Sequence, residues 1–173
     1  MKAIIFYYSN SGKTKKIAEN IKKDLGCEMI SIEPEVSYGS YFKAIARSRK
    51  EKKSGEVAKY FAPIVDISDV DVILVGYPVW FSKPPVIVSD YLKKYDLDGK
   101  KIVPFATSGS TNVKSTLKAL EESIGNAKIQ LPFNHSIINV WLKIMLATDW
   151  DISFITTYLD LITFISRFPI KRS

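Results

Sequence analysis

Short runs of apolar residues alternate along the chain with stretches whose apolar positions recur every three or four residues. The main runs span residues 3–8, 70–76 and 102–106, and they are rich in isoleucine, valine and aromatic side chains. Runs without strict alternation are typical of strands covered on both faces, as in a parallel sheet. Residues 28–32 are shorter and alternate between polar and apolar, which predicts an edge strand.

Amphipathic helices are expected between and after these strands. Residues 14–25 place their apolar side chains on one face and their lysines on the other. Residues 85–95 begin at a proline, and residues 114–124 end before Gly125, which are typical helix start and stop signals. Strands that alternate with helices predict right-handed β-α-β units and a doubly wound α/β fold.

Ligands of doubly wound sheets bind beyond the carboxyl ends of the strands, so the segments that follow the strands carry most of the functional information. Residues 9–14 join a buried strand to a helix and consist mainly of small hydroxyl and amide residues. Free backbone N–H groups at a helix N-terminus, together with such side chains, suit a phosphate group. The same residue types also make ordinary helix caps, so this segment alone leaves both interpretations open.

Two further segments follow buried strands. In residues 77–82, Tyr77, Trp80 and Phe81 could stack on a flat ring, or they could pack beneath the next helix. Residues 107–112 are small and polar, so they could supply donors to the edge of a heterocycle or form an ordinary loop. Because all three segments are expected at one end of one sheet, together they fit a phosphorylated aromatic cofactor.

Composition excludes several other classes of protein. The 173 residues are 46% hydrophobic, which suits one folded domain spanning residues 1–173 and excludes a disordered chain. Cys27 is the only cysteine and His135 the only histidine, so no internal disulfide or Cys/His zinc site is expected. Gly12-Lys13-Thr14 resembles the end of a nucleotide P-loop, but Tyr7 occupies the position of the required first glycine. No metal site and no catalytic residue are assigned.

The three segments resemble those of the flavodoxin-like FMN-binding family, in particular its short-chain flavodoxin branch. Residues 8–14 resemble the family's phosphate loop, tyrosine-serine-x-threonine-glycine-asparagine-threonine, with Ser11 in place of threonine and Lys13 in place of asparagine. Residues 76–85 are similar to a glycine-x-proline-isoleucine-tryptophan-tryptophan loop before a proline-started helix, with Phe81 replacing the second tryptophan. Residues 104–110 resemble the family's third loop. The resemblance covers about residues 1–128.

This resemblance implies a three-layer α/β sandwich with a five-stranded parallel sheet of order 2-1-3-4-5 and non-covalently bound FMN. The implied role is an electron carrier between a reductase and an acceptor enzyme, with no catalytic residues of its own. Two alternatives stay open: an NAD(P)H- or quinone-linked reductase that accepts a small aromatic substrate, and a binding module that has lost FMN. The implied cofactor-binding residues are Ser9, Asn10, Ser11, Gly12, Lys13 and Thr14 for the phosphate, Pro78, Val79, Trp80 and Phe81 for the isoalloxazine ring, and Thr107, Ser108, Gly109 and Ser110 for its polar edge.

The positive charge of the chain bears on its partners. It has 25 Lys+Arg against 18 Asp+Glu, a net charge of +7, whereas the electron carriers of the family are typically acidic. The segment Lys43–Lys53 is the most basic stretch and contains only one acid, Glu51. It is either a solvated helix face or a docking patch for an acidic partner or an anionic surface. No nucleic-acid module is recognisable. The N-terminal apolar run is too short for a signal peptide, and together with the free cysteine this favours a cytoplasmic protein.

The last part of the chain, residues 129–173, differs from the recognisable core, residues 1–128. It holds only seven charged residues. Residues 127–133 could supply the fifth strand, and residues 152–168 could form a last helix on the sheet. The apolar stretch 152–168 is short for a membrane span, which needs about 20 residues. It could also mediate a homodimer or membrane-surface contact, or reflect an altered reading frame.

Overall fold

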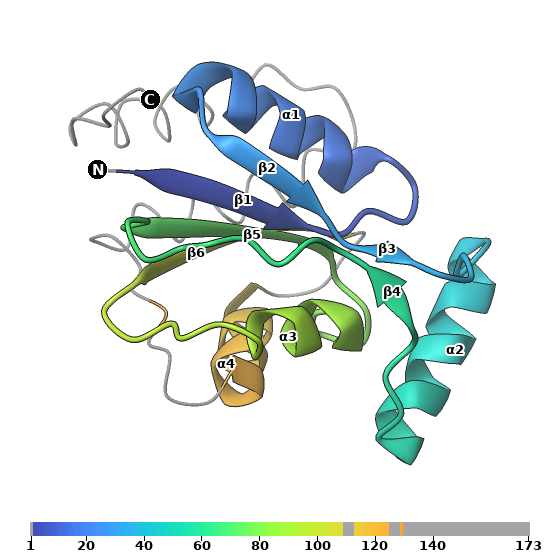
Figure 1. The fold of residues 1–173 in the computed structure, drawn as a ribbon. Coiled ribbons are helices and arrows are strands. Elements are labelled where there is room, and N and C mark those ends of the chain that lie inside the picture. Colours follow the sequence, from blue (N-terminus) through green and yellow to red (C-terminus); the bar gives the residue numbers. More distant parts are fainter. Residues whose placement is uncertain (1, 109–112, 125–128, 130–173) are drawn as a thin grey trace.

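In the computed structural model, the structure is described for residues 2–108, 113–124 and 129. Its centre is a parallel sheet with the strand order β2-β1-β5-β6. Helix α1 covers one face of this sheet, and helices α3 and α4 cover the other (Figure 1). The strands are β1 (Ala3–Tyr7), β2 (Glu28–Ser31), β5 (Val72–Pro78) and β6 (Lys101–Thr107), and the helices are α1 (Lys13–Leu25), α3 (Val86–Leu92) and α4 (Val113–Ile124).

The predicted doubly wound fold is confirmed. The order β2-β1-β5-β6 corresponds to the first four positions of the expected order 2-1-3-4-5. The predicted fifth strand at 127–133 and the predicted last helix at 152–168 lie outside the described residues, apart from residue 129. Within the described part of the chain, no helix is long and apolar enough to cross a membrane.

The three largely apolar runs form strands whose central side chains are shielded from water. Phe6, Ile73 and Ile102 have no exposed surface, and Ile73 pairs in register with Ile4 on one side and Ile102 on the other. Strand β2 stands at the end of the order β2-β1-β5-β6 and, among the described residues, pairs only with β1. These positions match the predictions of buried strands and an edge strand.

Helix α3 is shorter than its predicted range of 85–95. It ends at Leu92, and the chain then tightens through bonds between residues three apart, from Lys94 N to Tyr91 O and from Tyr95 N to Leu92 O. The ring of Tyr95 stacks on Phe6 at a centroid distance of 5.1 Å, which fixes this tighter turn against the sheet. The apolar periodicity that predicted a helix to residue 95 therefore continues past Leu92, where the α-helical backbone ends.

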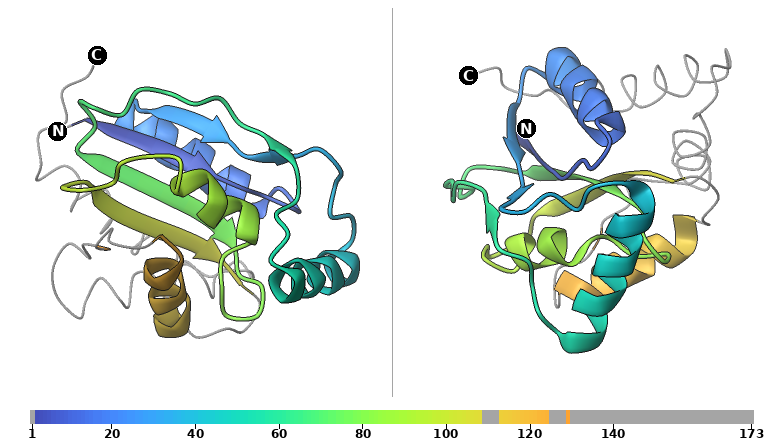
Figure 2. Two further views of the ribbon diagram at one scale, coloured as in Figure 1. Left: turned by 60° about the horizontal axis from the view of Figure 1, so that its bottom comes forward. Right: turned by 90° about the vertical axis from the view of Figure 1, so that its right-hand side faces the viewer.

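The connection from β2 to β5 contains β3 (Glu33–Pro34), α2 (Tyr41–Ser54) and β4 (Tyr60–Phe61). β3 and β4 form a separate antiparallel pair. Helix α2 lies beside the end of the sheet toward which the parallel strands point, rather than over either face (Figures 1 and 2). This position brings the basic segment to the edge of the sheet where the three candidate loops lie.

Candidate cofactor site

The first loop joins β1 to α1 and leaves the start of this helix without a side-chain cap. The cap residue is Gly12, with φ 82° in the left-handed region, so the cap position has no side chain to bond to the first turn. A glycine suits this backbone angle because it has no Cβ. The alternative in which serine, threonine or asparagine caps the helix is therefore not observed. The first N–H groups of a helix attract anions when no cap satisfies them.

The side-chain hydroxyl of Ser9 is buried without a hydrogen-bond partner in the described part of the chain. Leaving a buried hydroxyl unpaired costs about 1–3 kcal/mol, so such groups normally have a partner. A small anion in front of α1 would provide an acceptor for this hydroxyl. Ser11, Gly12 and Lys13 are exposed beside it, whereas Thr14 is buried.

Thr107 joins the three loops. Its Oγ1 lies 2.9 Å from Oγ1 of Thr14, and its carbonyl accepts a hydrogen bond of 2.8 Å from the N–H of Val79. Thr14 in the first turn of α1, Val79 directly after β5 and Thr107 at the end of β6 thus meet at one place. The structure therefore brings together one residue from each of the three candidate loops. Ser108 follows Thr107 and is half-buried, whereas Gly109 and Ser110 lie outside the described residues.

The second loop separates its two aromatic side chains. Trp80 is only 3% exposed, and its ring packs against Tyr8 and Tyr38 at centroid distances of 5.7 and 5.0 Å. Phe81 is 48% exposed. Tyr77, which was expected in this loop, lies within β5 and is fully buried. The structure therefore offers Phe81 as an accessible ring, while Trp80 forms part of the packing around the site.

A tight turn explains the exposure of Phe81. The backbone N–H and carbonyl groups of Trp80 and Lys83 bond to each other at 3.0 and 3.1 Å. Between them, Phe81 and Ser82 have φ 50° and 59°. The left-handed region costs non-glycine residues about 1–2 kcal/mol each. Strain of this kind tends to persist at functional sites, where the surrounding structure holds it in place.

Replacing Ser82 by glycine is expected to relieve part of this strain. The Ser82→Gly variant should gain about 0.5–1 kcal/mol of stability, because glycine adopts this backbone angle without a steric penalty. Thermal unfolding should show this as a Tm higher by about 1–4 °C. Ser82→Ala is the control, since it retains the Cβ that causes the strain. An equal gain in both variants would contradict the assignment to the backbone.

Tyr38, a buried tyrosine that the sequence did not indicate, also packs against Trp80. The hydroxyl of Tyr38 donates a hydrogen bond of 2.8 Å to Oε2 of Glu51, and the guanidinium of Arg47 lies 4.3 Å from its ring centroid. Burial, followed by the hydrogen bond to Glu51, raises the pKa of Tyr38 well above its ordinary value, so the hydroxyl stays protonated. Tyr38 belongs to none of the family-like loops, which is why sequence reasoning missed it.

Asn10 is used inside the protein. Its Oδ1 accepts a hydrogen bond of 2.9 Å from the hydroxyl of Tyr8, and its Nδ2 donates one of 3.1 Å to the carbonyl of Gly39. Burial raises the pKa of Tyr8 well above its usual range, which keeps this donor protonated. Asn10 thus fixes the first loop against the turn before α2. Its expected role toward a phosphate stays a prediction.

The described residues contain no group of three or more His, Cys, Asp or Glu side chains placed to hold a metal ion. Cys27 is buried at the amino end of β2, away from the three loops, and burial raises the pKa of its thiol to about 11. A thiol with this pKa stays protonated near neutral pH and is a weak nucleophile.

A parallel sheet between two helical layers, with converging loops at its carboxyl edge, defines a doubly wound α/β protein of the flavodoxin-like fold. The flavodoxin family model matches residues 2–144, and the chain belongs to this family. A search of curated proteins gave no match.

Several solved structures are similar to this chain. A flavoprotein from Lactobacillus acidophilus, solved in complex with FMN, is 26% identical, with a TM-score of 0.63 over 73% of this chain and 88% of that one. A putative flavoprotein from Bacteroides eggerthii is 25% identical, with a TM-score of 0.65 over 83% and 97% of the two chains. A putative flavoprotein from Bacteroides uniformis is 22% identical, with a TM-score of 0.63 over 82% and 97%.

Proposed function

We propose that this protein binds FMN without a covalent bond and acts as an electron carrier between a reductase and an acceptor enzyme. The buried hydroxyl of Ser9, which has no partner among the described residues and precedes the glycine-capped start of α1, carries this proposal because it could donate to a phosphate oxygen. The likeness to the Lactobacillus acidophilus flavoprotein in complex with FMN supports the choice of cofactor.

The residues present fit the three parts of FMN. Ser9, Ser11, Thr14 and the first N–H groups of α1 would hold the phosphate, and the charge of Lys13 would stabilise it. Phe81 would offer its exposed ring to the isoalloxazine, and Pro78, Val79 and the packed Trp80 precede it in the same loop. Thr107 and Ser108 would bond the polar edge of the ring, with Gly12 giving the phosphate loop its turn. The roles of Asn10, Gly109 and Ser110 remain predictions.

When bound, FMN supplies the redox chemistry, in steps of one or two electrons. The chain orients the cofactor and limits the access of water to it. The bonds of Thr107 to Thr14 and Val79 fix the spacing between the parts that hold the phosphate and the ring. The contacts of Trp80 with Tyr8 and Tyr38 close the second loop against the protein body.

A reductase that takes NAD(P)H or a quinone as its small-molecule partner is the second candidate. The exposure of Phe81 favours it, because an accessible ring at the edge of the site could stack on a flat substrate. The third candidate is a binding module without FMN. Two observations favour this candidate: the side chain of Asn10 is bonded to Tyr8 and Gly39, and Lys13 stands where the family's phosphate loop has asparagine.

The absorption spectrum of the purified full-length protein tests the cofactor. A yellow protein that releases FMN on heating, or takes up added FMN, is expected. A colourless protein that takes up no FMN would exclude both the carrier and the reductase. Oxidation of NAD(P)H with a quinone acceptor then separates these two, because a reductase turns over alone whereas a carrier needs a separate reductase.

The Ser9→Ala variant should change stability and FMN affinity in opposite ways. The protein without FMN should keep or slightly increase its stability, because the variant removes a buried hydroxyl that has no partner. FMN binding should weaken by about tenfold or more, since a hydrogen bond to a charged group contributes about 1.5–3 kcal/mol. Titration of the flavin fluorescence and urea unfolding measure the two effects.

Ser123→Ala is the matched control for Ser9→Ala. The Ser123 hydroxyl lies 2.9 Å from that of Ser89 and 2.7 Å from the carbonyl of Leu120, between α3 and α4. Its removal should lower stability and leave FMN affinity unchanged. Unchanged FMN affinity in the Ser9→Ala variant would show that the first loop does not hold the phosphate.

A further inference from the structure

Helix α2 is held next to the candidate FMN site by residues of the turn before it and by residues within the helix. The turn before it is bonded to the first loop, from Asn10 Nδ2 to the carbonyl of Gly39. The ring of Tyr38 contacts Trp80 of the second loop, and Arg47 and Glu51 of α2 hold this tyrosine in place. A protein bound to the outer side of α2 would therefore lie beside the site.

The charge of α2 is divided between its two sides. Ala44, Ser48 and Glu51, spaced three and four residues apart, are buried and form the inward face. Glu51, the only acidic residue of the helix, forms an ion pair of 2.9 Å with Arg47. The negative charge of Glu51 is thus used inside the protein and does not offset the charges on the outer side.

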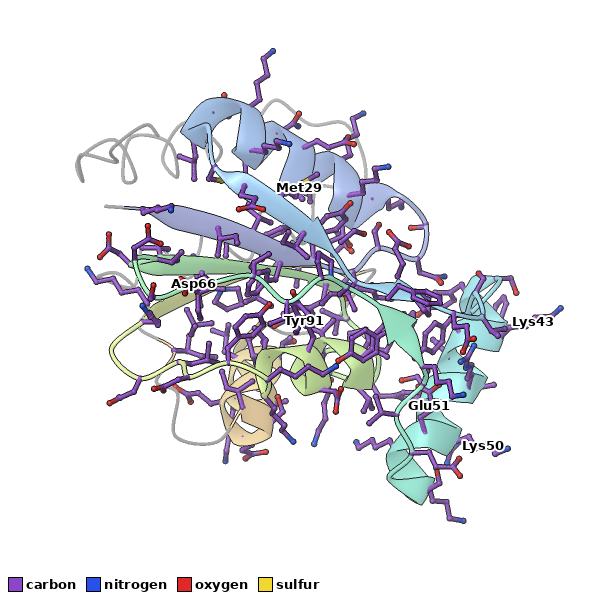
Figure 3. The ribbon with its side chains drawn as sticks, in the orientation of Figure 1. Met29, Lys43, Lys50, Glu51, Asp66 and Tyr91 are labelled. Atoms are coloured by element: carbon purple, nitrogen blue, oxygen red, sulfur yellow. The ribbon has the colours of Figure 1, made fainter. Side chains whose placement is uncertain are left out.

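The outer side of α2 carries a set of uncompensated positive charges. Lys43 and Lys50 project from the helix away from the sheet (Figure 3). Among the residues that the structure describes, none of the five exposed basic side chains has an ion-pair partner. They are Lys43, Arg49, Lys50, Lys52 and Lys53.

An exposed aromatic pair accompanies these charges at the N-terminal end of the helix. Phe42 is 81% exposed and Tyr41 60%, and their rings meet edge to face at a centroid distance of 5.7 Å. An exposed phenylalanine ring does not stabilise a helix face that contacts only water. Protein interfaces typically combine aromatic anchors with a charged rim. A membrane-bound helix, by contrast, needs an apolar stripe along its outward face, and the outward face of α2 is mainly basic.

We propose that the exposed surface of α2, formed by Phe42, Lys43, Arg49, Lys50 and Lys53 on its outer side with Tyr41 and Lys52 at the margin, is the docking surface for an acidic electron-transfer protein. The statement that the partner exchanges electrons with this protein rests on the proposed function. The statement that the partner is acidic and binds here rests on the charge of α2. Positive potential beside the site would steer a negatively charged partner into an orientation near the cofactor.

Binding to an acidic protein probe tests this surface. The probe is a plant-type [2Fe–2S] ferredoxin, labelled for fluorescence anisotropy, and the basic protein cytochrome c is the negative probe. The full chain should bind the ferredoxin at low ionic strength, and salt should weaken this binding. K43E/K50E should weaken it by about tenfold or more, and Phe42→Ala should raise the dissociation rate.

K22E/K23E is the matched control, because it changes the net charge by the same amount at the far end of α1. Both of its lysines are exposed. This variant should lower the affinity by no more than about threefold, since distant charges are screened. An equal loss in the two double variants would show a response to net charge alone and would overturn the proposal. Absence of ferredoxin binding, with α2-dependent binding to vesicles containing phosphatidylserine, would overturn it in favour of an anionic membrane surface.

The binding measurement is independent of FMN, so the two proposals can fail separately. If the protein takes up no FMN but binds ferredoxin through α2, the docking surface stands and the electron-carrier function fails. If it takes up FMN and binds ferredoxin without dependence on Lys43 and Lys50, the docking proposal fails alone. Where both proposals hold, electron transfer from ferredoxin that has been reduced beforehand to the bound, oxidised flavin should slow in K43E/K50E more than in K22E/K23E.

Discussion

Gly76→Ala is expected to lower the free energy of unfolding by about 3 kcal/mol, since overpacking of a close contact costs about 1–3 kcal/mol and occasionally more. Gly76 and Phe105 are paired neighbours on β5 and β6. A Cβ at position 76 would lie 2.3 Å from Cζ and 2.5 Å from Cε2 of the Phe105 ring. Neither strand can move without breaking the sheet register, so the strain would be retained. Urea unfolding measures the loss.

Phe105→Leu provides the test of this explanation. The smaller side chain removes the ring atoms that the new methyl group would meet, so the double variant should be more stable than the sum of the two single effects predicts. Gly99→Ala is the matched control, because φ is 70° at Gly99 and its Cβ would meet no atom within 4 Å. It should cost only about 1–2 kcal/mol, from backbone strain. Additive effects of Gly76→Ala and Phe105→Leu would contradict the explanation.

Trp80→Ala should have the second large effect, lowering the free energy of unfolding of the FMN-free protein by about 3–5 kcal/mol. The buried indole packs against the rings of Tyr8 and Tyr38, so its loss would leave a cavity beside the candidate site. FMN affinity should fall as well, because the second loop would lose its attachment. Urea unfolding without FMN and flavin fluorescence titration separate the two effects.

Trp80→Phe is the matched variant for this prediction. A phenyl ring keeps part of the contact with Tyr8 and Tyr38, so stability should be lower than in the parent by about 1–2 kcal/mol. FMN affinity should be affected less than in Trp80→Ala. A Trp80→Ala variant as stable as the parent would show that the ring contacts contribute little.

The pattern of apolar residues was sufficient for the described strands of the parallel sheet, whereas the order of these strands was implied by the resemblance to the flavodoxin-like family. Central strands have large apolar side chains at nearly every position, as at Phe6 and Ile73, and this pattern survives without any knowledge of tertiary contacts. The convergence of the three loops also followed from the sequence, because parallel strands end at the same edge. The contact between Thr14 and Thr107, 93 residues apart, is its direct result.

Other parts of the site depend on contacts that no local pattern encodes. Tyr38 is buried because Glu51 and Arg47, on another element, satisfy its hydroxyl and ring. The pair β3 and β4 has two residues in each strand, which is too short for any periodicity. The burial of Trp80 and the exposure of Phe81 follow from the backbone angles of Phe81 and Ser82, which are unusual for these residue types.

The pair β3 and β4 gives the crossover between β2 and β5 the form of a closed stem. Glu33 pairs with Phe61, Pro34 pairs with Tyr60, and the N–H of Glu35 bonds to the carbonyl of Lys59 at 2.8 Å. The segment that carries α2 therefore leaves and returns to the body at the same point. Insertions between two adjacent anchor points are well tolerated, because the ends of the loop are already held together. Natural variation can thus change the outward face of this segment without disturbing the parallel sheet, whereas Tyr38 and Gly39 keep its inner side tied to the loops of the candidate site.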